Sequence, residues 1–429
     1  MARGIIWLLG AGLLLLGFVV GRMVGPPAIV FPAVDEARDA VAMENAVRSA
    51  LVEPRAFSRA STLIRLFEGL TQENVVGASR AVTARAARED PVDLLLFLTA
   101  WVHLDPLAAV REVESWPIQS RREIGIKTAI REWAASGRQL EAADYFQTIT
   151  DPDLRAAAAG PLVRGWALGG TAREALGLAQ RLWNSEAQLD VVDGFVRGVL
   201  HSGGPEAAIG IAGTVAAKAD GDFEQRLARV TLSLTGLEDP VAAAGLYDEL
   251  TRMGPTEWLS GSLARLAESW GNDDPQAALE WLLTRADSAE RSGALGKTMG
   301  RWAIRDFDTA WAWFAIRRGA AQGDAALGAT DSTLLAGLLR RMARIRPVEA
   351  SRWVTRLRDA SDRDGLMLRV AFFWSSFDPV SALQWIDGLT LPAEQRDRLR
   401  QAVEGGRQQT RAGRELELLE APSLARPPQ

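Results

Sequence analysis

One pattern returns along this chain at a spacing of about 34 residues. In its fullest form a Trp is followed by Asp-Pro, then by Ala and a second Trp, as at Trp270, Asp274-Pro275, Ala278 and Trp281. Nine units can be aligned, and their first positions are residues 101, 133, 166, 200, 235, 270, 302, 342 and 374. Such a period is typical of proteins that stack one small helical unit on the next.

Each position in the unit has a physical reason. The Asp can accept hydrogen bonds from the free N–H groups at the start of a helix, and Pro suits the first helical position, where no N–H is needed. The Ala and the second Trp then lie on one face of that helix. No segment sustains the two-residue alternation of a strand. The sequence therefore predicts an all-α fold, an α/α solenoid of helical hairpins preceded by one N-terminal transmembrane helix.

The predicted organisation has four parts. Residues 37–405 form the solenoid, which begins with helices at 37–51, 55–69, 71–87 and 91–102. Residues 25–36 are a Pro-containing linker. Residues 406–429 are polar, and we expect a largely disordered tail with one short helix at 411–420. Residues 1–24 are the membrane anchor.

The anchor prediction depends on eighteen residues without a charge, 4–21, which read GIIWLLGAGLLLLGFVVG. A helix of this length spans about 27 Å, close to the ~30 Å hydrocarbon core of a bilayer. A cleaved signal peptide is the alternative, although the small-residue cleavage positions are poorly formed. Arg3 and the amino terminus favour a cytoplasmic N-terminus, so the bulk of the chain would be periplasmic, anchored in the inner membrane. Gly17 and Gly21 form a Gly-x-x-x-Gly through which two copies could dimerise.

Composition excludes several classes of site. The chain has no Cys, which excludes disulfides, thiolate metal sites and cysteine nucleophiles. The net charge of −5 removes the strong cationic field of nucleic-acid binders, so we expect no nucleic-acid partner. Nothing in the sequence indicates a cofactor or a metal site.

The repeat resembles the tetratricopeptide class of α-helical repeats, and more closely a group of bacterial envelope proteins with Trp...Asp-Pro...Ala...Trp units, most of them without known function. The resemblance covers about residues 90–404. It departs from the tetratricopeptide consensus because the Trp-x2-Leu-Gly-x2-Tyr opening is absent. The resemblance implies a scaffold for protein–protein interaction and no catalytic residue.

Features that imitate catalytic motifs have simpler interpretations. The run 293–298 ends like a phosphate-binding loop but lacks the required upstream Gly and the preceding strand. His103 and His201 lie about three repeats apart, so we interpret each as a turn residue. The acidic pairs Asp273-Asp274 and Glu89-Asp90 lie at predicted helix starts, where capping explains them. An α/α hydrolase acting on envelope polysaccharide through two such acids is the alternative to a non-enzymatic scaffold.

The 15 Trp residues mostly fall on repeat positions. Those we expect in the core are Trp101, Trp133, Trp166, Trp270, Trp281, Trp302, Trp313, Trp353, Trp374 and Trp385. Trp258 and Trp311 lie off the pattern and are candidates for the surface.

Charge is distributed unevenly along the chain. Residues 25–250 contain 22 basic and 31 acidic groups, whereas residues 251–405 contain 21 and 20. In the C-terminal units, basic residues recur five positions and one position before the Trp or its equivalent, which places them on one helix face. We call this set the basic column: Arg265, Lys297, Arg301, Arg341 and Arg369. It is the candidate binding face for an acidic partner protein, and an ordinary solvated face is the alternative.

Overall fold

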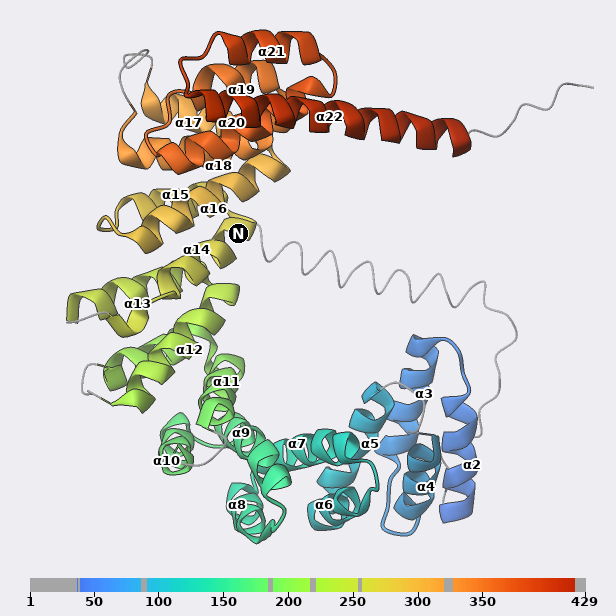
Figure 1. Ribbon diagram of the computed structural model, residues 1–429. Helices are drawn as coiled ribbons and strands as arrows, with labels where there is room; N and C mark the ends of the chain where they lie inside the picture. The colour runs from blue at the N-terminus through green and yellow to red at the C-terminus, as the bar shows by residue number, and fades with distance from the viewer. Residues whose placement is uncertain are drawn as a thin grey trace, which may run out of the picture. The chain divides into compact units, whose positions relative to one another are not determined.

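The computed structural model describes residues 37–420, apart from residues 38, 86–90, 184–187, 217–220, 254–256 and 320–326 (Figure 1). The regular elements of these residues are 21 α-helices and one short 3-10 helix. This confirms the predicted all-α class. None of the described helices combines the length and the apolar character needed to span a bilayer, and the predicted anchor at residues 4–21 lies outside the described residues.

The chain divides into two compact units, Met1–Phe195 and Val196–Gln429. The helices of the first unit are α2 (Ala40–Leu51), α3 (Ala56–Glu68), α4 (Val75–Arg85), α5 (Pro91–Leu104), α6 (Pro106–Ser115), α7 (Gln119–Ala135), α8 (Gln139–Thr148), α9 (Pro152–Gly169) and α10 (Ala172–Leu182). Helix α11 (Gln188–Ala216) includes the residue at which the two units are divided. The first four helices lie close to the ranges predicted from the sequence.

The second unit also consists of consecutive helices. Its elements are α12 (Asp222–Glu238), α13 (Pro240–Met253), η2 (Glu257–Leu259), α14 (Ser262–Asp273), α15 (Pro275–Leu283), α16 (Ala289–Arg305), α17 (Phe307–Arg318), α18 (Ala329–Ile345), α19 (Pro347–Val354), α20 (Ala360–Ser375), α21 (Pro379–Asp387) and α22 (Ala393–Glu420). The first helices of successive hairpins, α12, α14, α16, α18, α20 and α22, pack one against the next in chain order (Figure 1). Each second helix packs between the first helix of its own hairpin and that of the next. This packing agrees with a helical solenoid.

The turn between the two helices of a hairpin has the geometry that the repeat predicts. The backbone N–H of Asp274 donates to the carbonyl of Trp270 at 2.9 Å, which closes the first helix. The Asp274 carboxylate then accepts from the N–H of Ala277 at 2.9 Å, and Pro275 begins the second helix. The same cap is made by Asp105, Asp239, Asp306 and Asp378. The predicted capping role of these aspartates is confirmed.

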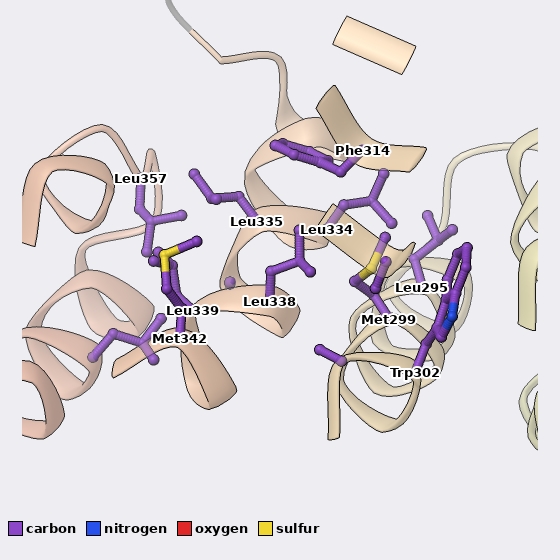
Figure 2. Close-up of a cluster of buried hydrophobic side chains, with 14 of the residues drawn as sticks. Leu295, Met299, Trp302, Phe314, Leu334, Leu335, Leu338, Leu339, Met342 and Leu357 are labelled. Carbon is purple, nitrogen blue, oxygen red and sulfur yellow. The ribbon is translucent and has the colours of Figure 1, made fainter. Parts of the chain in front are cut away.

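A continuous core runs through the second unit from α13 to α22. Figure 2 shows part of it, in which leucines of α18 lie between side chains of α16 and Leu357. Leu334, Leu338 and Met342 are fully buried there. The repeat alanines, such as Ala278 and Ala310, are also fully buried, because a small side chain is needed where the two helices of a hairpin approach.

The two Trp residues of a unit contact each other across their hairpin. The ring centroids of Trp270 and Trp281 are 6.0 Å apart, and those of Trp302 and Trp313 are 5.8 Å apart. Seven of the ten repeat Trp residues are buried, as predicted: Trp101, Trp133, Trp166, Trp270, Trp281, Trp302 and Trp374. The prediction is wrong for Trp313, Trp353 and Trp385, which pack against the core with one side and remain half-buried. Off-pattern Trp258 and Trp311 are also half-buried.

Glycine determines how closely two first helices approach. A Cβ added to Gly337 of α18 would lie 2.7 Å from the carbonyl oxygen of Gly296 on α16. Real Cβ atoms do not come so close to a backbone oxygen, so this contact requires Gly at position 337. The backbones of α16 and α18 are therefore in close contact at this point.

The region after Gly405 differs from the prediction. Helix α22 continues without interruption to Glu420, whereas we expected a largely disordered tail with a short helix at 411–420. The segment is rich in Glu, Gln, Arg and Leu, which are good helix formers and favour continuation of a helix that is already nucleated. Residues 421–429 lie outside the described residues.

Candidate binding surface and the α12–α14 hollow

The basic column lies on the first helices of consecutive hairpins. Arg265 is on α14, Lys297 and Arg301 are on α16, and Arg369 is on α20. These four side chains are exposed, as the prediction of a surface face requires. Arg341 on α18 is half-buried, and its Nε is buried with no hydrogen-bond partner among the described residues. Its neighbour Arg340 is exposed instead.

The basic column is not purely positive. Arg301 forms an ion pair with Glu268 of α14, so part of its charge is neutralised by a carboxylate 33 residues away. The guanidinium of Arg369 lies over the ring of Phe373, with 5.8 Å between its Cζ and the ring centroid. Arg265 and Lys297 lie in neither arrangement, and they remain the exposed charges best placed to contact a partner. The basic column was defined from the recurring basic residues alone, so the sequence pattern did not indicate the pairing of Arg301 with Glu268.

A hollow of about 290 Å³ lies between α12 and α14, and we call it the α12–α14 hollow. One side is formed by α12 and the other by α14, and Arg265 of the basic column belongs to its lining. The lining residues are Arg229, Leu232, Ser233, Gly236, Leu237, Ser262, Arg265, Leu266, Glu268, Ser269 and Asn272. Its volume is near the lower end of the ~300–1,000 Å³ found for ligand pockets.

Two polar groups in this lining have no hydrogen-bond partner among the described residues. Ser262 is 4% exposed, and its hydroxyl oxygen is buried without a partner. The Nε of Arg229 is likewise buried and without a partner. By contrast, the hydroxyl of Ser269 donates to the carbonyl oxygen of Gly236 at 2.7 Å, which joins the two helices. A buried polar group without a partner costs free energy, so each such group requires an explanation.

Alignment of the repeat units indicates this hollow, although the basic and aromatic positions alone do not. Ser262 occupies the eighth position before the Trp, where four other units have buried apolar residues: Leu227, Ala294, Leu334 and Leu366. Arg229 occupies the sixth position before Thr235, where the following units have small or apolar residues: Ala264, Gly296, Ala336 and Leu368. A polar residue at a core position is a departure that usually has a functional reason.

The motifs that imitate catalytic sites lie in helices or at their caps. Residues 293–298 are inside α16, so they form no phosphate-binding loop. His103 is in the last turn of α5 and His201 is on α11, and both are exposed. Gly204, the last residue of the His-Ser-Gly-Gly run that begins at His201, has a φ of 74° and breaks α11 before Pro205. Glu89 and Asp90 lie outside the described residues.

Several titratable groups of the described residues have shifted pKa values. Hydrogen bonds from Thr309 and Ser381 lower the pKa of the cap residues Asp306 and Asp378, respectively. Burial raises the pKa of Tyr247 on α13. Within the described part of the chain, no group of three or more His, Asp or Glu side chains could hold a metal ion.

Comparison with models of known families, with curated proteins and with solved structures finds no match to this chain. The resemblance to tetratricopeptide-like envelope proteins therefore remains a prediction from the repeat.

Proposed function

We propose that this protein is a membrane-anchored helical-repeat scaffold that binds a partner protein at the cell envelope. The observation that carries the proposal is the row of packed first helices in the second unit, which exposes Arg265, Lys297 and Arg369 on three of four successive hairpins. Stacked hairpins offer extended surfaces of this kind, and repeat proteins commonly bind through them. An acidic segment of the partner is the complementary surface.

The uncharged residues 4–21 support anchoring in the inner membrane, with the solenoid on the periplasmic side. Mass spectrometry of the mature N-terminus, combined with alkaline extraction of membranes, tests this part. An extracted chain that begins after residue 21 would contradict the anchor. Alkaline phosphatase fused after Gln429 tests the orientation. An inactive phosphatase fusion, together with cytoplasmic fluorescence of a fluorescent-protein fusion at the same place, would show that the solenoid is on the cytoplasmic side.

Charge reversal tests the binding face. The variant carries Arg265→Glu, Lys297→Glu and Arg369→Glu, and the partner is recovered by crosslinking in intact cells. Arg301 is left unchanged because it is paired with Glu268. The matched control reverses three exposed arginines outside the basic column, namely Arg252, Arg352 and Arg358. We expect the first variant to lose partner recovery and the control to keep it, while both retain the wild-type melting temperature.

Salt dependence adds a second criterion. The screening length falls from about 10 Å at 0.1 M salt to about 3 Å at 1 M, so a contact through exposed charges must weaken. Equal recovery from wild type and from the Arg265, Lys297, Arg369 variant, at both salt concentrations, would assign the binding face to another surface. A variant with a single Asp→Asn change that folds normally but no longer supports the function of the protein in cells would instead favour the hydrolase alternative.

A further inference from the structure

The α12–α14 hollow combines three kinds of group that one ligand can satisfy together. Arg229 and Arg265 provide two guanidinium groups, one from each helix. Ser262 provides a buried hydroxyl that has no hydrogen-bond partner among the described residues. Leu232, Leu237 and Leu266 provide apolar surface in the same hollow. A ligand with an anionic group beside an apolar group matches this lining.

The charge of the lining favours an anionic group. The lining has two arginines and one glutamate, and Glu268 is itself paired with Arg301. Positive charge therefore exceeds negative charge at the hollow, which suits an anionic group such as a carboxylate. Guanidinium groups bind carboxylates through short, charge-assisted hydrogen bonds, and a serine hydroxyl can donate a further one.

The apolar part of the lining favours one source of that carboxylate. The last residue of a peptide presents its α-carboxylate and its side chain from the same Cα, so both can enter a single pocket. An Asp or Glu side chain ends in the carboxylate and brings no apolar group beside it. Leu237 is 68% exposed and Leu232 and Leu266 are buried, so Leu237 is the leucine that an entering chain can reach. Capture of a C-terminal carboxylate is one of the recurring modes of peptide recognition.

We propose that the α12–α14 hollow binds the C-terminal residue of a partner polypeptide, with Arg229, Arg265 and Ser262 holding its carboxylate and Leu237 contacting its apolar side chain. The inference rests on the proposed scaffold function, because it names the recognition chemistry at one end of the basic column. It also gives Ser262 and Arg229 a reason to differ from the small or apolar residues at the same positions of the units that follow.

The test uses the full-length chain in detergent micelles and three pools of acetylated hexapeptides. The first pool ends in leucine with a free carboxylate, the second is the same pool with a C-terminal amide, and the third is amidated with aspartate at the fifth position. We expect the first pool to bind about tenfold or more tightly than the other two, because loss of a charge-assisted hydrogen bond has an effect of this size. Equal binding of the amidated leucine pool would overturn the proposal. Tight binding of the aspartate pool would assign the carboxylate to a side chain and would also overturn it.

Variants of the lining provide the second readout. We expect Arg265→Gln to weaken binding of the first pool about tenfold and Ser262→Ala about threefold, since each removes one donor to the carboxylate. Glu268→Gln should tighten binding about two- to fivefold, because it removes a negative charge from the lining. The control Arg340→Gln changes an exposed arginine outside the hollow and should leave binding unchanged. Wild-type affinity in both Arg265→Gln and Ser262→Ala, or no binding of any pool at about 1 mM peptide, would overturn the proposal.

Failure of this inference is distinguishable from failure of the scaffold proposal. If the peptide pools do not bind but the Arg265, Lys297, Arg369 reversal still abolishes partner recovery, the scaffold proposal stands and the hollow has another role. If the free-carboxylate pool binds and the reversal leaves partner recovery unchanged, the hollow is a peptide site and the basic column is ordinary surface.

Discussion

Two pairs of first helices in the second unit pack in opposite ways. Between α16 and α18, Gly296 and Gly337 let the backbones meet, and leucines such as Leu338 fill the adjacent space (Figure 2). Between α12 and α14, a hollow of about 290 Å³ remains and is lined by arginines and serines. The two interfaces occupy equivalent places in the same repeat. A change of residue type at a few positions is therefore enough to convert a closed contact into an open one.

Individual interfaces of the repeat can thus be specialised without loss of the scaffold. Helix α14 has 12 residues, whereas α12, α16 and α18 each have 17. Ser262 begins α14 at a place where the longer helices already bury an apolar side chain. Loss of apolar packing at one interface is tolerated because each hairpin also packs against its other neighbour.

Shortening a leucine in the closed interface should have the strongest consequence. Leu338→Ala removes a fully buried side chain, and we expect the free energy of unfolding to fall by about 2 to 5 kcal/mol because a cavity is left in a tightly packed core. The matched change Leu237→Ala affects a side chain that is 68% exposed beside the hollow, and it should change stability by less than about 0.5 kcal/mol. Urea unfolding of both variants measures the difference. Similar losses would show that the α12–α14 hollow is closed in solution.

Glycine substitutions should give effects of opposite sign. Gly337→Ala brings a Cβ against the carbonyl of Gly296, and we expect a loss of about 1 to 3 kcal/mol from overpacking. Gly293→Ala lies on the exposed face of α16 with no atom within 4 Å of the added Cβ, and it should stabilise the protein by up to about 1 kcal/mol. Thermal melting distinguishes the two. If Gly337→Ala melts at or above the wild-type temperature, the backbones of α16 and α18 do not meet there.

Two serines of α14 provide a finer comparison within the hollow. Ser269→Ala breaks the hydrogen bond to Gly236, and we expect a loss of about 0.5 to 1.5 kcal/mol. Ser262→Ala removes a buried hydroxyl without a described partner, so the expected result lies between no change and a gain of about 1 kcal/mol. Chemical denaturation of both variants without added peptide is the measurement. A clear destabilisation by Ser262→Ala would indicate a protein partner for that hydroxyl.

The weakest effect concerns pH and should not distinguish the two interfaces. Hydrogen bonds from Thr309 and Ser381 lower the pKa of Asp306 and Asp378 in the folded protein. A lowered folded-state pKa stabilises the fold above the unfolded pKa of about 3.9, and this contribution is lost as the pH falls through the lower folded value. We expect the stability difference between wild type and the Asp306→Asn, Asp378→Asn variant to be constant from about pH 7 to pH 5 and to shrink below about pH 4. A difference that grows on acidification would contradict the lowered pKa values.

The elements that depend on local interactions could be predicted from the sequence. Asp274 and Pro275 begin α15 because a cap and a fixed φ act within four residues, and the spacing of Trp270, Ala278 and Trp281 places them on facing sides of one hairpin. Such interactions involve nearby positions, so the all-α hairpin repeat could be predicted without coordinates. The continuation of α22 to Glu420 shows where composition alone misleads, since a polar segment can extend a helix that is already formed.

Tertiary packing, by contrast, decides which basic positions are available to a partner and where the interfaces open. Arg301 is paired with Glu268, and Arg341 is half-buried. Arg229 and Ser262 line the same hollow from different helices. In both pairs the two residues are about 33 positions apart in the sequence. Each of these facts depends on how the first helices of neighbouring hairpins pack against each other. That packing is determined by the volumes of many side chains at once, whereas the repeat pattern specifies only which face each side chain occupies.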